Sequence, residues 1–319
     1  MLGRLARYRR DAHIIAYHRI AVPSRDPWGL AVSPTNFAIH LDLIRCRGSV
    51  LSLDELVERA HQSDLPDNAV AITFDDGYLD NLTTAAPLLA ALDAPATLFL
   101  ATGPMARTEP YWWDELADFV LDAPECEACL TIDNRKIRIA LGPREPLDDV
   151  GAPAWRAWDP PQTARRALHW KLWSVLRCLP QAGIVQGLEA IRSVFSGSHD
   201  ENTRPMSCAE IKLLISETRF TLGGHTVDHA DLTAHGDIEM RRQIALGRET
   251  IAALAGTQPK AFAYPYGHAN RRAATEVRKA GFAYACTTVA GPISRTTPRF
   301  ALPRVPAQDV PSIAWLEAC

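Results

Sequence analysis

The sequence predicts an α/β protein with a barrel-like core and a mostly helical insertion that is rich in tryptophan. At both ends of the chain, short apolar runs alternate with amphipathic helical patterns, which is typical of parallel strands joined by helices. Between them, residues 107–205 break this rhythm and hold six of the eight tryptophans. We therefore expect residues 1–106 and 206–319 to form the core, and residues 107–205 to form an insertion or cap.

The N-terminal part of the core begins with a strand–helix–strand alternation. The run at residues 69–73 is apolar up to its end, as expected for a strand buried on both faces. Serine stands at two expected helix starts: Ser33 precedes apolar residues at helical spacing, and Ser52 forms a capping-box pattern with Glu55. The predicted strands are 13–17, 69–73 and 96–100, and the predicted helices begin at Ser33 and Ser52 and span 80–92.

The C-terminal part repeats the alternation. Ser207 and Glu210 again have the capping-box spacing, and Gly281 follows a helical pattern as a good C-cap. The predicted helices span 207–216, 237–255 and 271–280, and the predicted strands span 220–223, 261–264 and 283–287.

The insertion has its own pattern. Residues 131–141 alternate like a hairpin that turns near Asp133 and Asn134, and helical patterns cover 163–178 and 183–195. Its tryptophans favour a sugar ligand mildly, because aromatic faces stack on pyranose rings. The other interpretation is that most of them form the core of the insertion.

Composition and charge argue against several classes of protein. A formal net charge of −3 lacks the electrostatic footprint of a nucleic-acid binder, and no apolar run reaches the ~20 residues of a membrane span. Four arginines lie among the first ten residues without the apolar stretch of a secretory signal, so we expect at most weak contact with a membrane surface. The seven cysteines are scattered, which favours a reducing, cytoplasmic compartment. Cys126 and Cys129 form a lone C-x-x-C, for which a metal or redox role is the less favoured interpretation.

Two acidic residues and two histidines stand where predicted strands end. Asp75 and Asp76 follow one strand, and His225 and His229 follow another. Ligands collect at the carboxyl ends of parallel strands, and adjacent carboxylates there repel each other unless a cation or proton intervenes. A turn at Gly77 would let both aspartates reach one site, and a helical turn would place both histidines on one side. Asp76 with two histidines leaves coordination positions open, as in catalytic metal sites. Taken singly, the aspartates also fit a solvated turn, and each histidine fits a structural role.

Together these residues resemble the motifs of a known family. The runs TFDDG at 73–77 and HTVDH at 225–229 look like the first two motifs of the polysaccharide deacetylases with NodB homology, carbohydrate esterase family four, and FAYPYG at 262–267 looks like the third. YHRI at 17–20 and SLDEL at 52–56 further resemble the branch that contains poly-N-acetylglucosamine deacetylases. The resemblance covers residues 12–105 and 206–306 and implies a distorted (β/α) barrel of the NodB-homology type. It leaves the insertion unexplained.

The resemblance implies a metal-dependent hydrolase. Such an enzyme removes N-acetyl groups from an amino-sugar-containing glycan or a lipid-linked oligosaccharide, as in exopolysaccharide biosynthesis. The resemblance makes Asp76, His225 and His229 ligands of a divalent metal, usually zinc, and makes Asp75 the general base that activates water. Other first-row divalent ions would suit the same ligands.

The third motif carries two further roles in this family. The backbone N–H of Tyr266, beside Pro265, would stabilise the oxyanion. Many members have an arginine that orients the catalytic aspartate, but Ala263 stands at that position here. Arg304, from a neighbouring strand end, is our candidate to supply the missing charge.

The general acid also departs from the commonest pattern of the family. The usual histidine of a late Leu-x-x-His motif is missing, because Leu302 is followed by Pro303, Arg304 and Val305. In the poly-N-acetylglucosamine branch the acid comes from an N-terminal Tyr-His, which His18 matches, and His268 is the rival. The fourth motif, which lines the acetyl pocket, is not recognisable around residues 286–288.

Three other functions stay open on the sequence alone. The same fold and site could hydrolyse another C–N amide, the chain could be a non-catalytic glycan-binding protein, or it could be a structural partner in a glycan-synthesis assembly. The complete set of two aspartates and two histidines speaks against the second.

Overall fold

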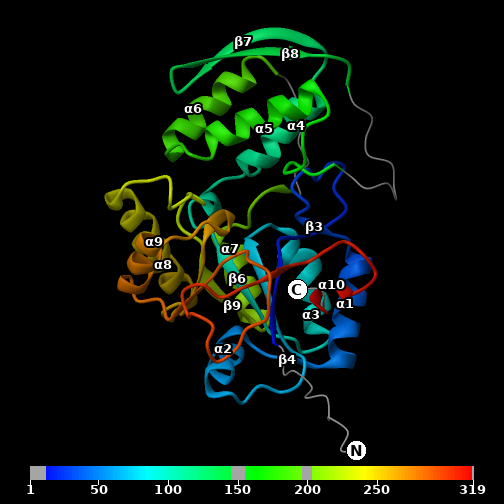
Figure 1. Ribbon diagram of the computed structural model, residues 1–319, viewed down its shortest axis with the longest axis vertical. Helices are drawn as coiled ribbons and strands as arrows, with labels where there is room; N and C mark the ends of the chain where they lie inside the picture. The colour runs from blue at the N-terminus through cyan, green and yellow to red at the C-terminus, as the bar shows by residue number, and fades with distance from the viewer. Residues whose placement is uncertain (1–11, 145–154, 196–202, 318–319) are drawn as a thin grey trace, which may run out of the picture.

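The computed structural model describes residues 12–144, 155–195 and 203–317, and its centre is a curled sheet of parallel strands (Figure 1). Eight strands take part, in the order β11-β10-β9-β6-β5-β1-β12, with β4 paired to β5. Every pair in this sheet is parallel. The strands are β1 (His13–Tyr17), β4 (Ser49–Val50), β5 (Ala69–Asp76), β6 (Ala96–Leu100), β9 (Phe220–Gly224), β10 (Ala261–Ala263), β11 (Tyr284–Cys286) and β12 (Val305–Pro306).

The two ends of the sheet meet at the C-terminal segment of the chain. β12 pairs with β1 through Val305 and Ile15. Three residues before Val305, Leu302 forms a parallel bridge with Cys286 of β11. Residues 302–306 therefore lie between the two ends of the sheet and close it into a distorted barrel. The predicted (β/α) barrel is confirmed.

Helices cover the outside of the barrel, and serine caps mark several of their starts. Ser207 and Glu210 form a complete capping box at α7. At α2 only half of the predicted box forms, because Ser52 accepts from the Glu55 N–H while the Glu55 side chain pairs with Arg59 at 2.8 Å. The main helices of the barrel are α1 (Pro34–Arg47), α2 (Leu53–Gln62), α7 (Cys208–Glu217), α8 (Asp237–Ala255) and α9 (Arg271–Lys279), and the short α10 (Ala314–Glu317) lies near the C-terminus.

One predicted helix is wrong in detail. Instead of a single α-helix over 80–92, the chain forms a π-helical segment (Asn81–Ala85) followed by the short α3 (Ala86–Ala90). The buried Asp80 before it accepts hydrogen bonds from Nε of Arg19 at 3.1 Å and from the backbone N–H of Ile20 at 2.9 Å. These tertiary bonds tie the start of the segment to the short strand β2 (Arg19–Ile20), which pairs with β3 (Ala31–Val32), and they override the helical spacing.

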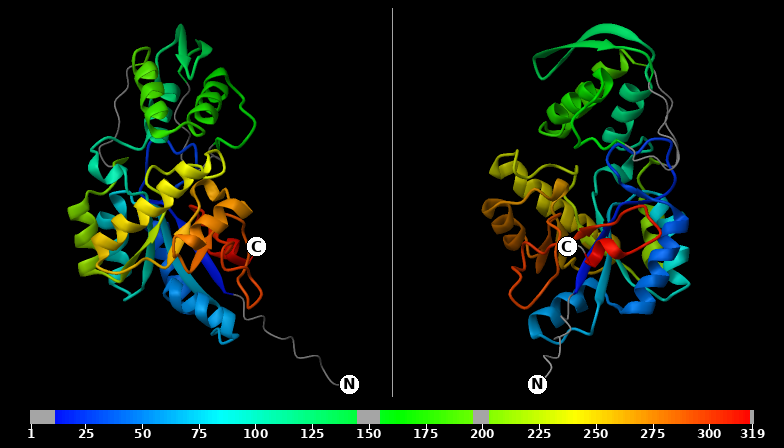
Figure 2. Two further views of the ribbon diagram at one scale, coloured as in Figure 1. Left: turned by 90° about the vertical axis from the view of Figure 1, so that its left-hand side faces the viewer. Right: turned by 45° about the vertical axis from the view of Figure 1, so that its right-hand side comes forward.

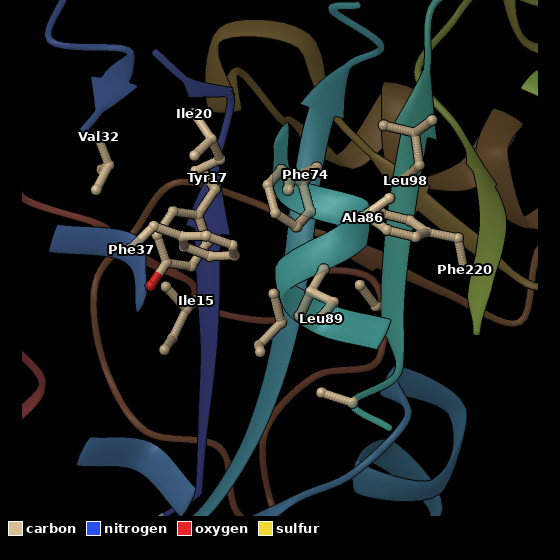
Figure 3. Close-up of a cluster of buried hydrophobic side chains, with 14 of the residues drawn as sticks. Ile15, Tyr17, Ile20, Val32, Phe37, Phe74, Ala86, Leu89, Leu98 and Phe220 are labelled. Carbon is tan, nitrogen blue, oxygen red and sulfur yellow. The ribbon is translucent and has the colours of Figure 1, made fainter. Parts of the chain in front are cut away.

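The largest apolar core lies between the sheet and helices α1 and α3 (Figure 3). All eight residues of β5 are buried, as expected for a strand covered on both faces. Tyr17 of β1 contacts Phe74 of β5 with ring centroids 5.5 Å apart, and Phe37 of α1 contacts both rings at 5.0 and 5.9 Å. These packed rings fix the strands relative to one another, and thereby fix the residues at their carboxyl ends.

The insertion forms a layer of its own over one end of the barrel (Figures 1 and 2). Its elements pack around a separate apolar cluster. The hairpin turns at Asp133 and Asn134, whose φ angles are 50° and 59°, so this predicted turn is confirmed. The helix α4 was not predicted, since its N-cap Tyr111 makes no side-chain capping bond. The limits 107 and 205 stay a prediction. The elements are α4 (Trp112–Asp122), β7 (Cys126–Ile132), β8 (Arg135–Leu141), α5 (Ala164–Leu176) and α6 (Gln181–Arg192).

The structure also bears on the expectations about membrane contact and about the pair Cys126 and Cys129. No helix in the described ranges has the length and apolar character needed to cross a membrane. The basic N-terminus lies within residues 1–11, outside the described residues, so weak membrane contact stays a prediction. Cys126 and Cys129 are both unpaired, and their spacing on β7 points them to opposite faces of the strand, which does not favour a shared metal.

Candidate active site

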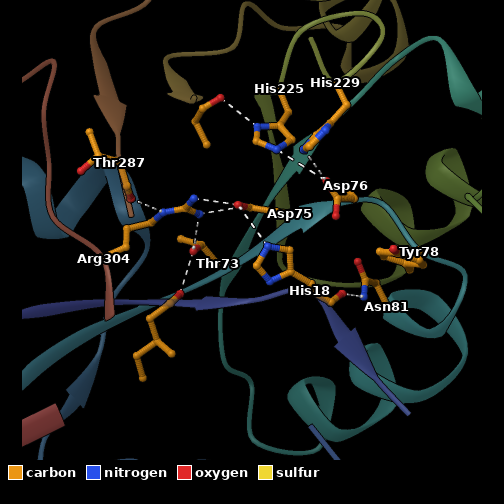
Figure 4. Close-up of polar contacts among 12 residues, drawn as sticks. His18, Thr73, Asp75, Asp76, Tyr78, Asn81, His225, His229, Thr287 and Arg304 are labelled. Carbon is orange, nitrogen blue, oxygen red and sulfur yellow. Dashed lines mark hydrogen bonds and ion pairs between the residues drawn. The ribbon is translucent and has the colours of Figure 1, made fainter. Parts of the chain in front are cut away.

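The candidate site is built on the carboxyl end of β5 (Figure 4). Asp76 is the last residue of the strand and already has a left-handed backbone, with φ of 73°, and Gly77 follows with φ of 101°. This change of direction brings the carboxylates of Asp75 and Asp76 to one cavity, although strand residues normally alternate sides. The predicted turn thus begins one residue earlier than expected. A Cβ at Gly77 would also lie 2.6 Å from Cδ1 of Leu100, so the leucine side chain would have to shift.

His225 and His229 come together on a loop after β9, and the helical turn that their spacing suggested is wrong. Thr226 and His229 have positive φ angles of 67° and 54°. Gln243 of α8 supports the loop, because its Oε1 accepts hydrogen bonds from two successive backbone N–H groups at 3.0 and 2.9 Å. The pair is placed where we expected it, but by a tertiary contact with α8.

Asp76, His225 and His229 can hold a cation between them. Their ligand atoms lie within 4.8 Å of one another, and no other such group was found in the described part of the chain. Nε2 of His225 and Nε2 of His229 lie 3.5 and 3.3 Å from Oδ1 of Asp76, and this buried oxygen has no hydrogen-bond partner. Leaving such an oxygen unsatisfied is unfavourable. A cation between the three side chains would satisfy it, and the set fits zinc or another first-row divalent ion.

The protonation of the three side chains agrees with this interpretation. Nδ1 of His225 lies 2.8 Å from the carbonyl oxygen of Ala263, which can only accept, so Nδ1 carries a proton and Nε2 faces Asp76. Burial lowers the pKa of His229 to about 3, so this imidazole is neutral. Burial alone would raise the pKa of Asp76, but His229 and His225 lower it below its ordinary value. Burial lowers the pKa of His225, but the nearby carboxylates raise it overall, so a proton and a metal compete for its Nε2.

Asp75 is held by Arg304. Nη1 and Nη2 of Arg304 donate to the two carboxylate oxygens at 2.6 and 2.7 Å, and its Nε donates to the carbonyl of Thr287 at 3.1 Å. The two side chains are 1% and 4% exposed. Burial alone would raise the pKa of Asp75, but the guanidinium lowers it far below its ordinary value, so the carboxylate stays charged. Arg304 reaches the site because it lies in the segment that closes the barrel.

The two candidate acids have different partners. Nε2 of His18 lies 3.8 Å from Oδ2 of Asp75, and its side chain is 25% exposed. Nδ2 of Asn81 donates to the backbone carbonyl of His18 at 2.8 Å, which fixes the chain there. Nδ1 of His268 instead lies 2.8 Å from Oδ2 of Asp231, and its side chain is 44% exposed. Both histidines line the same cavity, but only His18 contacts the predicted base.

The cavity over these residues has a volume of about 430 Å³. Tyr266 lines it, with φ of 59°, and Pro265 lies buried beside it. Four tryptophans also line the cavity, and no individual role was predicted for any of them. The ring of Trp113 packs against His229 at 4.6 Å between centroids. The high tryptophan content of the insertion was the only signal that could have found most of them. The four are Trp28, Trp113, Trp158 and Trp173.

Comparisons with known proteins agree with this fold. A family model described as polysaccharide deacetylase matches residues 62–123 and 196–285, on either side of most of the insertion. No curated protein matches the chain. Among solved structures, the deacetylase PplD of Streptococcus pyogenes, in complex with acetate, is similar with a TM-score of 0.59 and 16% identity over 94% of this chain and 93% of that one. IcaB from Ammonifex degensii has a TM-score of 0.58 and 19% identity over 97% of each chain. A de-N-acetylase from Aggregatibacter actinomycetemcomitans has a TM-score of 0.56 and 13% identity over 96% and 98%.

The structural likenesses establish a deacetylase-type barrel, closed around a site that can hold a cation. The chain belongs to the polysaccharide deacetylase family, of the NodB-homology type. The family and the fold together support a hydrolase that removes acetyl groups from a glycan.

Proposed function

We propose that the protein is a divalent-metal-dependent N-deacetylase that acts on an amino-sugar-containing glycan. The observation that carries this proposal is the split pair of aspartates, in which Asp76 faces two histidines and Asp75 is held by an arginine. Asp76, His225 and His229 would hold the metal, with zinc as the first choice among first-row ions. When bound, such a cation polarises a carbonyl group and lowers the pKa of water from ~15.7 toward ~7.

Asp75 is the proposed general base. The two hydrogen bonds from Arg304 keep its carboxylate ionised and hold it in one orientation. Each carboxylate oxygen has a further lone pair, so Asp75 can still accept a proton from a water molecule in the cavity. Arg304 acts through Asp75 and is a positioning residue.

His18 is the proposed general acid. The leaving amine needs a proton, and Nε2 of His18 lies at the cavity, 3.8 Å from Asp75. The acid and the base thus lie side by side, on the ends of the neighbouring strands β1 and β5. His268 is the weaker candidate because it is paired with Asp231.

Tyr266 is the proposed oxyanion residue through its backbone N–H. Its left-handed backbone turns the chain at the cavity wall, directly after Pro265. One such donor contributes roughly 3–4 kcal/mol to the stabilisation of a transition state.

The substrate that we propose is a glycan related to poly-N-acetylglucosamine or a lipid-linked oligosaccharide. The match of His18 to the acid of that branch supports this choice. A reducing compartment is supported by the six cysteines in the described ranges, which are all unpaired.

An acetate-release assay tests the proposal. Wild-type protein should release acetate from N-acetylglucosamine oligomers, and a chelator should abolish the release until zinc is restored. Asp75→Asn should be inactive but should still bind metal. Chelator-resistant acetate release, or release by Asp75→Asn at the wild-type rate, would contradict the proposal.

A further inference from the structure

We infer that tryptophans from the insertion and from the loop before β3 form a second sugar subsite, which binds the ring next to the acetylated one. The inference rests on the proposed function, because it takes the substrate to be a glycan. Trp28, Trp158 and Trp173 line the cavity that also holds Asp75 and Asp76.

A chain of ring contacts connects this group to the candidate metal ligands. Tyr266 contacts His229 with centroids 4.6 Å apart, Trp173 contacts Tyr266 at 5.7 Å, and Trp28 contacts Trp173 at 4.3 Å. One aromatic ring, Tyr266, thus separates Trp173 from His229, and two rings separate Trp28 from it. A sugar whose acetamide lies at Asp75 and Asp76 would place its neighbouring ring along this path.

Contacts between the loop before β3 and the insertion hold together Trp28, Trp158 and Trp173, which we call the wall of the subsite. The N–H of Ala157 donates to the carbonyl of Pro27 at 2.6 Å, and Nη1 of Arg156 donates to the carbonyl of Asp26 at 2.8 Å. Gly29 has φ of 61°, and a Cβ there would lie 3.2 Å from Cη2 of Trp158. The close approach at Gly29 therefore places Trp158 against the loop that carries Trp28.

The chemistry of the wall fits a pyranose better than an alkyl chain. Trp158 is 60% exposed, so it presents an apolar face at the cavity. Trp28 also lines the cavity, and its Nε1 has no hydrogen-bond partner among the described residues. A pyranose has an apolar face for stacking and hydroxyl groups that can accept from such an N–H. An alkyl chain would cover the indole faces but leave that N–H without a partner.

Binding measurements with a non-reacting variant test this inference. Calorimetry on Asp75→Asn would compare N-acetylglucosamine, N,N′-diacetylchitobiose and octyl N-acetylglucosaminide. The disaccharide should bind more tightly than the monosaccharide. Adding Trp158→Ala should weaken disaccharide binding about three- to tenfold, the size of one aromatic contact, and leave monosaccharide binding unchanged.

Val185→Ala, made in the same background, is the control. Val185 is 38% exposed on α6 of the insertion and does not line the cavity. It should leave both affinities unchanged, and thermal unfolding should show that both variants fold.

Three results would overturn the inference. The first is disaccharide affinity no higher than that of the monosaccharide, including no binding of either. The second is an equal loss for both sugars in Trp158→Ala. The third is a loss of affinity for the octyl glycoside alone in Trp158→Ala, which would assign the wall to an alkyl group.

Acetate release by the wild type separates this test from the proposed function. Equal release from the monosaccharide and the disaccharide leaves the function standing without the subsite. A disaccharide preference without any acetate release leaves the subsite standing without the function.

Discussion

The guanidinium of Arg304 donates to both carboxylate oxygens of Asp75, at 2.6 and 2.7 Å, across 229 positions of sequence. Both groups are buried, so the two charges depend on each other. The pairing joins the carboxyl end of β5 to the segment that closes the barrel.

Arg304→Met should therefore lower both activity and stability. We expect kcat for acetate release to fall by about 10²-fold, because Asp75 loses its orientation, and the free energy of unfolding to fall by roughly 3–5 kcal/mol. Arg304→Lys should recover part of the stability but less of the rate, since one ammonium cannot donate to both oxygens in a fixed fork. Steady-state kinetics and chemical denaturation would measure these effects. A variant Arg304→Met with the wild-type kcat would rule out the positioning role.

Substitutions of Asp75 and of Asp76 should have different effects on metal binding. Asp76→Ala should lose the bound metal, because it removes the only carboxylate of the proposed ligand set. Asp75→Asn should keep the metal and lose activity. Elemental analysis after dialysis, beside the acetate assay, would measure both. Equal metal content in the two variants would show that the assignment of roles is wrong.

His18→Ala should lower kcat by roughly 10²–10⁴-fold, the usual contribution of a general acid. His268→Ala should change kcat little, because this histidine is paired with Asp231. Each variant would be tested for unchanged metal content, so that a rate loss reports proton transfer. The reverse order of effects would assign the acid to His268.

Tyr111 should support the metal site from the start of α4. Its hydroxyl donates to the backbone carbonyl of Asp76 at 2.8 Å, where the chain has a positive φ. Tyr111→Phe should weaken metal affinity about tenfold, as loss of a supporting hydrogen bond does in other metal sites. Competition with a chromophoric chelator would measure it. Tyr284→Phe is the control, since its hydroxyl bonds to Asp54 at the other end of the strands, and an equal loss there would point to general destabilisation.

The cap of α7 should make stability depend on pH. Hydrogen bonds from Arg204 and from Ser207 lower the pKa of Glu210 to about 2, against an ordinary value of about 4.3. A lowered folded-state pKa means that the stabilisation is present above about pH 4.3 and is lost as the pH falls toward 2. Glu210→Gln should therefore lower the melting temperature at pH 7, and the difference from wild type should shrink between pH 4.3 and pH 2. A difference that does not change over this range would contradict the assigned pKa.

Local patterns predicted most of the barrel because its strands and caps depend on nearby residues. The apolar run that becomes β5 and the box formed by Ser207 and Glu210 were both visible in sequence. The segment after Asp80 was not, because buried hydrogen bonds to Arg19 and its neighbour changed a helical pattern into a π-helical one. The helix α4 was also missed, since it lacks a capping side chain.

By itself, the sequence determined the barrel, the two aspartates and the two histidines, because strand ends and short motifs are local features. The tertiary structure decided how these residues meet. It placed His225 and His229 on a loop held by Gln243, and it brought the tryptophans of the insertion to the cavity. It also showed that Arg304 reaches Asp75, which the sequence offered only as a hypothesis. The reason is physical: these contacts join segments that are distant in sequence, and only the closed barrel and the packed insertion bring them together.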